Sequence, residues 1–385
     1  MLHLADRTNQ LPNNFFAQIE RRIALLQSEG VDIIRLDIGS PDLPPHPNVI
    51  SSLANSAMQP GNHGYQPHLG PQQLRSSWAD HYKENFGVSL NPDTEVLPLL
   101  GSKEGIFHLS MALLNTGDKV LIPDPGYMTY TRGAIFAGAH PNYFPLLAEN
   151  NFLPDLTSLQ PGAIKDARMM WINYPNNPTG ATVSISDLQK AVDFAHKHGI
   201  IICSDCAYAQ VTYDQYRAPS IFEVSGAREV AVEFNSLSKS HNMPGWRAGV
   251  VVGNPQIIQA LFKIKTNIDS GGFKPVLDAS AEALKIDSSW IQARNQIYQD
   301  RRDLVLQTLS RKGFSAFKPK AAIYIWSKIP TQWSEFDFIT KMLEQSHVSI
   351  TPGSVFGPGG KGYFRIALST PTDRLQEAMS RLENF

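Results

Sequence analysis

The sequence predicts an α/β fold, with a three-layer α/β/α large domain around a mostly parallel sheet and a smaller α+β domain. From about residue 100, short apolar runs alternate with helical patterns, as is typical of strands buried on both faces of a parallel sheet. After about residue 280, a long helical stretch precedes short strands and a final helix, which favours an α+β unit. We therefore expect a large domain over 45–280 and a small domain formed by 1–44 and 281–385.

The first predicted element is an amphipathic helix over residues 15–29. Ile19, Ile23 and Leu26 recur at helical spacing, and Gly30 follows as a stop signal. A second helix is predicted over 187–197, between a candidate N-cap at Ser186 and a stop at Gly199.

Five nearly continuous apolar runs predict the buried strands of the large domain. These runs are Lys119–Pro123, Met169–Tyr174, Ile200–Ser204, Val230–Phe234 and Ala248–Val252. In the small domain, we expect one long helix over 281–312 and a final helix from Asp373. Between these helices the predicted strands are Ala322–Ile325, Val348–Thr351 and Tyr363–Leu368.

Composition excludes several classes of protein. The chain has 34 Lys+Arg against 35 Asp+Glu, so it lacks the basic excess of a general nucleic-acid binder. Its two cysteines cannot form a disulfide framework and suit a reducing compartment. We expect no membrane span, because no apolar run reaches about 18 residues. The N-terminus also lacks the pattern of a signal peptide, so we expect a cytoplasmic protein.

Polar side chains follow three of the predicted strands. Lys239 comes just after a buried strand, where desolvation lowers the pKa of an amine and makes it nucleophilic toward an aldehyde; a solvated surface lysine is the alternative. Asp205 ends another strand, at the sheet edge where α/β proteins bind ligands, although a helix N-cap is an equal alternative. Asn177 follows a third strand and could equally belong to a turn.

A phosphate-binding segment is also predicted. Gly101-Ser102-Lys103-Glu104-Gly105 opens a helical pattern, whose first turn offers free backbone N–H groups to an anion. The glycine spacing of a Walker A loop is missing.

Seven segments together resemble those of the fold-type I aminotransferases that depend on pyridoxal 5'-phosphate (PLP), in the aspartate aminotransferase superfamily (class I/II). The segments occur in family order over nearly the whole chain, and within the superfamily they look most like the LL-diaminopimelate aminotransferase group. They are GSKEGI (101–106), PDPGY (123–127), NYPNNPTGA (173–181), DCAY (205–208), FNSLSKSHNMPGWRAG (234–249), KTNIDSG (265–271) and FRIAL (364–368).

The resemblance implies a role for each residue around the cofactor. Lys239 would bind PLP covalently and then move the substrate α-proton. Asp205 would pair with the pyridine nitrogen, so that the ring acts as an electron sink. Tyr127 would stack on the ring, while Asn177 and Tyr208 would contact its phenolic oxygen. The phosphate would be bound by Ser102, Lys103, Ser236, Ser238 and Arg247.

The resemblance also implies how the substrate binds. Arg365 would bind the α-carboxylate bidentately, with Gly39 and Asn177 lining the substrate site. Tyr65 would reach the phosphate of a partner subunit, which implies a homodimer with shared sites. Phe273 lies near the position of the partner-subunit arginine in aspartate-specific relatives, which implies a more apolar pocket. Lys274 beside it is either a ligand for a distal acid or, by preference, a solvated cation.

Three local patterns are interpreted as structural. Cys203 and Cys206 form a C-x-x-C across a strand end, which we do not interpret as a redox or metal motif. His196 and His198 form an H-x-H at a helix end, where solvated histidines are favoured over a metal site. The Gly-rich segment 352–362 is interpreted as a turn that presents Arg365. We predict no bound metal.

The predicted function is amino-group transfer from an L-amino acid to a 2-oxo acid by a ping-pong mechanism. LL-2,6-diaminopimelate with 2-oxoglutarate is the first substrate choice, and aspartate, alanine or aromatic amino acids are alternatives. A PLP-dependent β-C–S lyase or decarboxylase on the same fold remains open, because fold does not fix function. A non-enzymatic binding protein is a third class, which the full set of cofactor residues disfavours.

Overall fold

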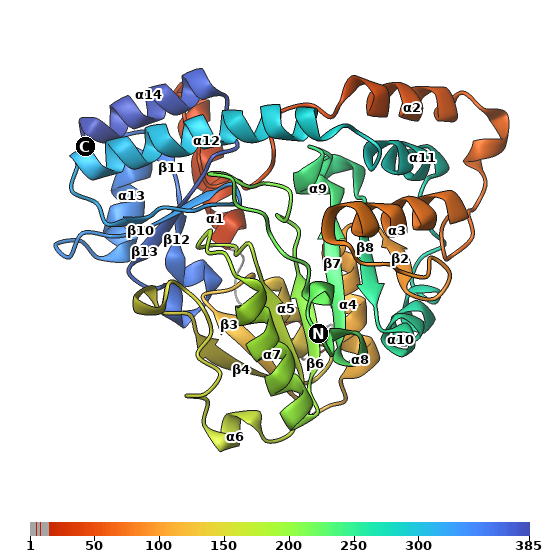
Figure 1. The fold of residues 1–385 in the computed structure, drawn as a ribbon. Helices are drawn as coiled ribbons and strands as arrows, with labels where there is room; N and C mark the ends of the chain where they lie inside the picture. The colour runs from red at the N-terminus through yellow and green to blue at the C-terminus, as the bar shows by residue number, and fades with distance from the viewer. Residues whose placement is uncertain (1–4, 6–7, 9–14) are drawn as a thin grey trace.

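The predicted α/β class is confirmed by a computed structural model, which describes residues 5, 8 and 15–385. A seven-stranded, mostly parallel sheet forms the centre of the larger part, and a four-stranded antiparallel sheet lies in the smaller part (Figure 1). Only β8 in the large sheet runs antiparallel to its neighbours, among the described strands. In spatial order the strands are β2 (Val96–Leu99), β8 (Gly249–Gly253), β7 (Ala231–Ser236), β6 (Ile201–Asp205), β5 (Ala167–Asn173), β3 (Lys119–Asp124) and β4 (His140–Pro145).

Helices cover both faces of the large sheet, which gives the predicted three layers. Val120 and Ile122 pack in one layer and Leu121 in the other, because successive side chains of a strand point to opposite faces. The first layer contains α4 (Ser102–Leu113), α5 (Thr129–Phe136) and α10 (Pro255–Lys265). The second contains α3 (Gln72–Phe86), α7 (Ile185–His198) and α11 (Lys274–Ala283).

The smaller part has a hydrophobic core of its own. Its antiparallel sheet has the order β12 (Thr351–Pro352), β13 (Tyr363–Ala367), β10 (Tyr324–Lys328) and β9 (Ala316–Phe317). A short parallel pair joins β1 (Ile34–Arg35) to β11 (Val348–Ser349). The helices of this part are α1 (Phe15–Ser28), α12 (Ser288–Arg311), α13 (Glu335–Gln345) and α14 (Thr372–Glu383).

Shorter elements connect these layers. They are the helices α2 (Pro47–Ala57), α6 (Pro161–Ile164), α8 (Ala227–Val230) and α9 (Leu237–Ser240), and the 3₁₀ turns η2 (Pro60–His63), η3 (Ala148–Asn150), η4 (Ile221–Glu223), η5 (Pro244–Trp246), η6 (Gly353–Phe356) and η7 (Pro358–Gly360). The long α12 runs along α14 at one end and follows α11 in the chain (Figure 1). The domain division near residue 280 stays a prediction. None of the described helices is both long enough and apolar enough to cross a membrane.

The five strands predicted for the large sheet are present, with their ends shifted by one or two residues. Sequence reasoning missed β2 and β4, the two edge strands of this sheet. Pro98 interrupts the short apolar run of β2, and β4 contains Pro141 and is largely solvent-accessible. Proline is tolerated on sheet edges, so neither strand has the apolar run of a central one.

Two helix predictions were wrong in detail. The N-cap of α7 is Ser184 and not Ser186, because the Ser184 hydroxyl accepts from the Asp187 N–H while the Asp187 carboxylate accepts from the Ser184 N–H. The helix predicted over 281–312 is interrupted, since α11 ends at Ala283 and Asp287 caps a separate α12.

Candidate active site

The candidate site lies at the carboxyl ends of β5, β6 and β7. Asn173 and Asp205 end neighbouring strands in register, and β7 leads directly into the short helix that carries Lys239. A cavity of about 310 Å³ opens there. It brings together nine of the residues predicted from the sequence: Gly39, Ser102, Lys103, Tyr127, Asn177, Asp205, Tyr208, Lys239 and Arg365.

Lys239 projects into this cavity from α9. Its Nζ donates a hydrogen bond of 2.5 Å to the carbonyl oxygen of Gly39 and lies 6.0 Å from the centre of the Tyr208 ring. Burial lowers the pKa of the Lys239 amine to about 8, and the nearby charges of Arg365 and Arg247 act in the same direction. The amine is therefore a stronger nucleophile near neutral pH than an ordinary lysine.

Asp205 is a buried carboxylate with two hydrogen-bond donors. The Tyr130 hydroxyl donates to its Oδ2 at 2.6 Å, and the Ala207 N–H donates to its Oδ1 at 3.2 Å. Burial raises the pKa of Asp205, while both hydrogen bonds oppose that rise. The carboxylate is thus prepared to bind a cationic or N–H group inside the cavity.

Arg365 is buried and only partly paired. Its guanidinium donates to the side-chain oxygen of Asn177 at 2.8 Å and to the carbonyl oxygen of Asp37 at 2.9 Å. It lies 4.1 Å from the Tyr324 ring centre and 4.7 Å from that of Phe356. Its Nε has no hydrogen-bond partner among the described residues. A buried donor without a partner is costly, so this arginine is suited to bind an anion.

Two tyrosines lie beside Lys239 and Arg365. The Tyr208 and Tyr324 hydroxyls are 2.7 Å apart, and burial raises the pKa of Tyr208 well above its ordinary value. An added Cβ at Gly39 would lie 2.2 Å from the Tyr324 hydroxyl, so this position has no room for a side chain. Tyr127 packs edge-on against Tyr130 and lines the cavity.

The amino end of α4 forms the predicted anion cradle. Gly101, with φ of 83°, caps α4, and an added Cβ there would lie 2.3 Å from the Arg247 guanidinium. Ser236 and Ser238 are buried at the start of α9, where the Ser236 hydroxyl accepts from the Ser238 N–H. Ser236, Ser238 and Arg247 are not among the residues that line the cavity, although Arg247 lies beside Gly101 at the start of α4, where the first turn offers free N–H groups.

Tyr65, Phe273 and Lys274 lie outside the cavity lining. Tyr65 is 92% exposed, and Phe273 is 49% exposed and packs near the His63 ring. Lys274 makes two 2.7 Å hydrogen bonds to Asp278 within its own helix, which agrees with the preferred interpretation as a surface cation. The resemblance places the segment 11–16 where relatives close over their substrate, and residues 11–14 of this segment lie outside the described residues.

The cysteine pair, the histidine pair and the Gly-rich segment that we interpreted as structural all make contacts within the fold. Cys203 and Cys206 are buried free thiols, and burial raises the pKa of both. His196 hydrogen-bonds the Gly226 carbonyl and His198 packs on Phe194. In the segment 352–362, the Gly359 N–H donates to the Asp124 carboxylate.

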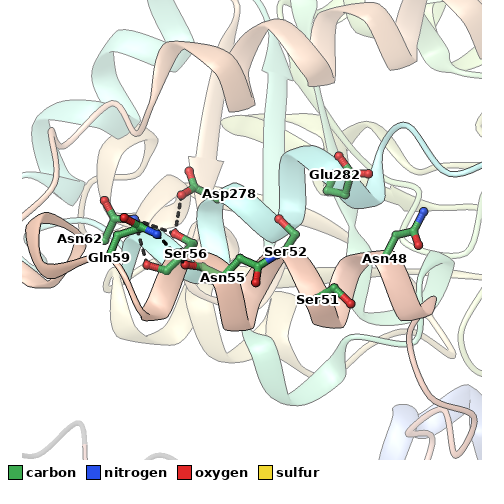
Figure 2. A pocket seen from close by; sticks show the side chains of 9 residues that line it. All are labelled: Asn48, Ser51, Ser52, Asn55, Ser56, Gln59, Asn62, Asp278 and Glu282. Carbon is green, nitrogen blue, oxygen red and sulfur yellow. Dashed lines mark hydrogen bonds between the residues drawn. The ribbon is translucent and has the colours of Figure 1, made fainter.

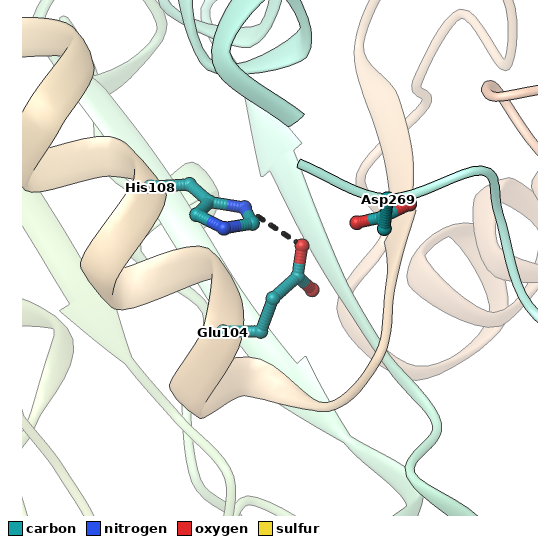
Figure 3. Close-up of side chains that lie close together, drawn as sticks. All are labelled: Glu104, His108 and Asp269. Atoms are coloured by element: carbon teal, nitrogen blue, oxygen red, sulfur yellow. Dashed lines mark ion pairs between the residues drawn. The ribbon is translucent and has the colours of Figure 1, made fainter. Parts of the chain in front are cut away.

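A group of three possible metal ligands occurs elsewhere, on α4 and the loop after α10. Figure 3 shows His108, whose Nδ1 lies 2.8 Å from the Glu104 carboxylate, with Asp269 on the facing loop. The Lys265 ammonium contacts Glu104 at 3.1 Å and Asp269 at 2.7 Å. Because the Lys265 ammonium already pairs with both carboxylates, we interpret the group as a buried ion-pair network.

A larger hollow of about 540 Å³ lies between α2 and α11 (Figure 2). Serine, asparagine and glutamine side chains line it, together with Asp278 and Glu282. None of its lining residues was predicted to act in the site, and the candidate nucleophile lies in the cavity described above.

Among the residues that line or support the site, sequence reasoning missed Tyr130, Arg132 and Tyr324, as well as lining residues such as Met128 and Phe356. Tyr324 lies within the predicted strand Ala322–Ile325, to which no role in the site was assigned. Tyr130 and Arg132 follow Tyr127 on α5, three and five residues later. The spacing of three between Tyr127 and Tyr130 was an available signal, because residues three apart on a helix share a face, but the spacing of five to Arg132 was not.

The family is decided by the match of residues 31–382 to the model described as aminotransferase class I and II. The chain is a class I and II aminotransferase. It is 46% identical to the LL-diaminopimelate aminotransferase of Desulforudis audaxviator, over 98% of this chain and 96% of that protein. Further relatives of the same name are 41 to 44% identical.

Solved structures agree with this family. The aminotransferase structure is similar to BacF from Bacillus subtilis, with a TM-score of 0.96 and 34% identity over 100% of this chain and 98% of that one. It is also similar to an aspartate aminotransferase double mutant from Thermus thermophilus, with a TM-score of 0.92 and 26% identity over 100% of both chains. The predicted family is therefore confirmed.

This aminotransferase is an enzyme that depends on PLP, as the class I and II family implies. The residues of the site fit that cofactor. The partly buried amine of Lys239, the buried carboxylate of Asp205 and the anion cradle at the start of α4 offer partners for an aldehyde, a pyridine nitrogen and a phosphate. The unpaired Nε of Arg365 offers a further donor in the same cavity.

Proposed function

We propose that this aminotransferase transfers an amino group from LL-2,6-diaminopimelate to 2-oxoglutarate. The observation that carries the proposal is the set of relatives with the LL-diaminopimelate aminotransferase name, which are 41 to 46% identical over almost their full length. The charged cavity agrees with substrates that carry a carboxylate at the reacting carbon.

Lys239 would bind the cofactor and move the proton. Its lowered pKa leaves a neutral fraction of the amine near neutral pH, which can bond to an aldehyde and later accept the substrate α-proton. Bound PLP supplies an electron sink for the electron pair that remains on the α-carbon. Ping-pong kinetics are expected, because the amino group passes through the enzyme before it reaches the oxo acid.

The other site residues would hold cofactor and substrate around Lys239. Asp205 would hold the pyridine nitrogen, with Tyr127 against the ring and Asn177 and Tyr208 near the phenolic oxygen. The α-carboxylate would bind Arg365, which has a free Nε and a planar donor fork. Ser102, Lys103, Ser236, Ser238 and Arg247 would hold the phosphate.

A donor panel tests this function. Purified holoenzyme is given LL-diaminopimelate, aspartate, alanine or phenylalanine with 2-oxoglutarate, and glutamate formation is followed together with the new oxo acid. We expect the highest kcat/KM with LL-diaminopimelate. A higher value with another donor would replace the proposed substrate. Release of ammonia or pyruvate without any oxo acid would favour the lyase alternative.

A homodimer with shared sites and a cytoplasmic location are part of the proposal. Tyr65 supports the first, because it is almost fully exposed in one chain although the resemblance assigns it to a phosphate. The two buried free thiols agree with the second.

A further inference from the structure

The cavity contains more positive charge than the proposed function uses. Four of its lining side chains are cationic, namely Lys103, Arg132, Lys239 and Arg365, and Asp205 is the carboxylate among them. In the proposed function Lys239 binds the cofactor, Arg365 binds the α-carboxylate, and Asp205 holds the pyridine nitrogen. The phosphate has the amino end of α4, with Lys103 on its first turn and Arg247 beside it. The Arg132 guanidinium is left without an anion.

Arg132 is placed by α5, one turn after Met128. It is half-buried, and within the described part of the chain its guanidinium has no ion-pair or hydrogen-bond partner. The charge of Arg132 also helps to lower the pKa of Lys103, although burial contributes more. Lys103 has the phosphate as its partner in the proposed function, so Arg132 is the neighbouring cation that still lacks an anion. A carboxylate beside its guanidinium would offset the repulsion between the two cations.

The side chains beside Arg132 are apolar. Tyr127, Met128 and Phe356 line the cavity together with Arg132, and they also line an adjoining cavity of about 170 Å³. Phe356 packs against the Arg365 guanidinium at 4.7 Å. Arg365 and Arg132 are therefore linked along the cavity wall by an aromatic and thioether surface, which suits a chain of methylene groups.

We propose that Arg132 is a specificity-determining residue that binds the second carboxylate of a dicarboxylic substrate. This inference rests on the proposed function, in which both the amino donor and the oxo-acid acceptor carry a carboxylate remote from the reacting carbon. The planar fork of arginine matches a carboxylate in a way that lysine does not. Arg365 would hold the carboxylate at the reacting end and Arg132 the one at the far end.

The test compares two oxo acids with the same five-carbon chain, since only 2-oxoglutarate carries the second carboxylate and 2-oxopentanoate does not. We expect Arg132→Gln to lower kcat/KM for 2-oxoglutarate by about 10- to 100-fold, the usual range for a lost charge-assisted hydrogen bond. For 2-oxopentanoate we expect a change within about twofold. For Arg132→Lys, we expect a kcat/KM for 2-oxoglutarate between those of wild type and Arg132→Gln. The control is Arg168→Gln, at an exposed arginine distant from the cavity lining.

A second readout does not depend on turnover. Glutarate and pentanoate are titrated into the holoenzyme, and binding is followed by calorimetry. We expect Arg132→Gln to weaken glutarate binding by a similar factor and to leave pentanoate binding unchanged. The dissociation constant of PLP should stay at its wild-type value.

Three outcomes would overturn the inference. An equal loss of kcat/KM for both oxo acids would mean that Arg132 acts on the reacting end of the substrate. An unchanged kcat/KM for both would mean that Arg132 is a solvated cation. Weaker PLP binding in Arg132→Gln would assign the guanidinium to the phosphate. If LL-diaminopimelate is not a donor, the proposed function fails, but the glutarate titration still decides the role of Arg132.

Discussion

Lys239 is held by a main-chain carbonyl that comes from 200 residues earlier in the chain. A carbonyl oxygen accepts a hydrogen bond from the amine without adding a full negative charge, so it does not counter the effect of burial as a carboxylate would. The low pKa of Lys239 thus follows from its location and from the two arginine charges nearby.

The first prediction concerns the pH dependence of cofactor binding at Lys239. We expect the rate of covalent PLP binding by the apo-enzyme to rise with pH, with a midpoint near the pKa of about 8. The reason is that only the neutral amine attacks an aldehyde. Rapid mixing with absorbance detection measures this rate. A midpoint above about pH 10, where ordinary lysines titrate, would contradict the prediction. Lys239→Ala should show no covalent binding at any pH.

The second prediction concerns the hydrogen bond from Tyr130 to Asp205. This hydrogen bond lowers the pKa of Asp205, so Tyr130→Phe should raise the pKa of that carboxyl. The interaction of the carboxylate with the pyridine nitrogen should then be weaker. We expect kcat/KM to fall about tenfold, as for loss of a hydrogen bond to a buried charge. The pH titration of the absorbance of bound PLP should shift as well. Tyr143→Phe on β4 removes an exposed hydroxyl contact and is the matched control, expected to change neither.

At the scale of one element, the start of α7 depends on two serines that are close in sequence. Ser184 and Asp187 exchange hydrogen bonds in a capping box, whereas Ser186 lies inside the first turn. The third prediction is that Ser184→Ala lowers the free energy of unfolding by about 1 kcal/mol, while Ser186→Ala changes it by less than about 0.5 kcal/mol. Urea denaturation of both variants measures the difference. The reverse order would restore the cap predicted from the sequence.

At the scale of the whole molecule, the fourth prediction concerns the homodimer. If Tyr65 serves the partner's site, Lys239→Ala and Tyr65→Ala chains should complement each other. A hybrid dimer then has one site with an intact Lys239 and an intact Tyr65, so mixing, unfolding and refolding the two inactive proteins should restore activity. If Tyr65 acts within its own chain, every hybrid site is defective and no activity returns. A monomer in sedimentation experiments would also refute the prediction.

The sequence predicted the central strands well because their side chains are buried on both faces and form continuous apolar runs. The run Val348–Thr351 was harder, since the structure divides it between β11 and β12 in two different sheets. Which sheet a residue joins depends on pairing with distant strands, such as Val348 with Ile34. Local pattern does not contain that information.

The residues of the candidate site likewise fall into those that local sequence predicts and those that depend on distant contacts. Its main residues could be predicted because they occur in recognisable segments such as DCAY and FRIAL. The contact of Tyr130 with Asp205 joins residues 75 apart in the chain, and it depends on the relative placement of α5 and β6. In the sequence, Arg132 cannot be distinguished from a solvated arginine on a helix surface, and only the cavity lining shows its position in the site.

The two edge strands that were missed have a consequence for behaviour at high concentration. Both β2 and β4 contain proline, which has no amide hydrogen to offer to a further strand. Exposed sheet edges are common starting points for aggregation between molecules, and proline blocks such growth. At β4, the accessible edge, the prolines that interrupt the apolar pattern therefore also limit extension by another chain, whereas β2 is buried.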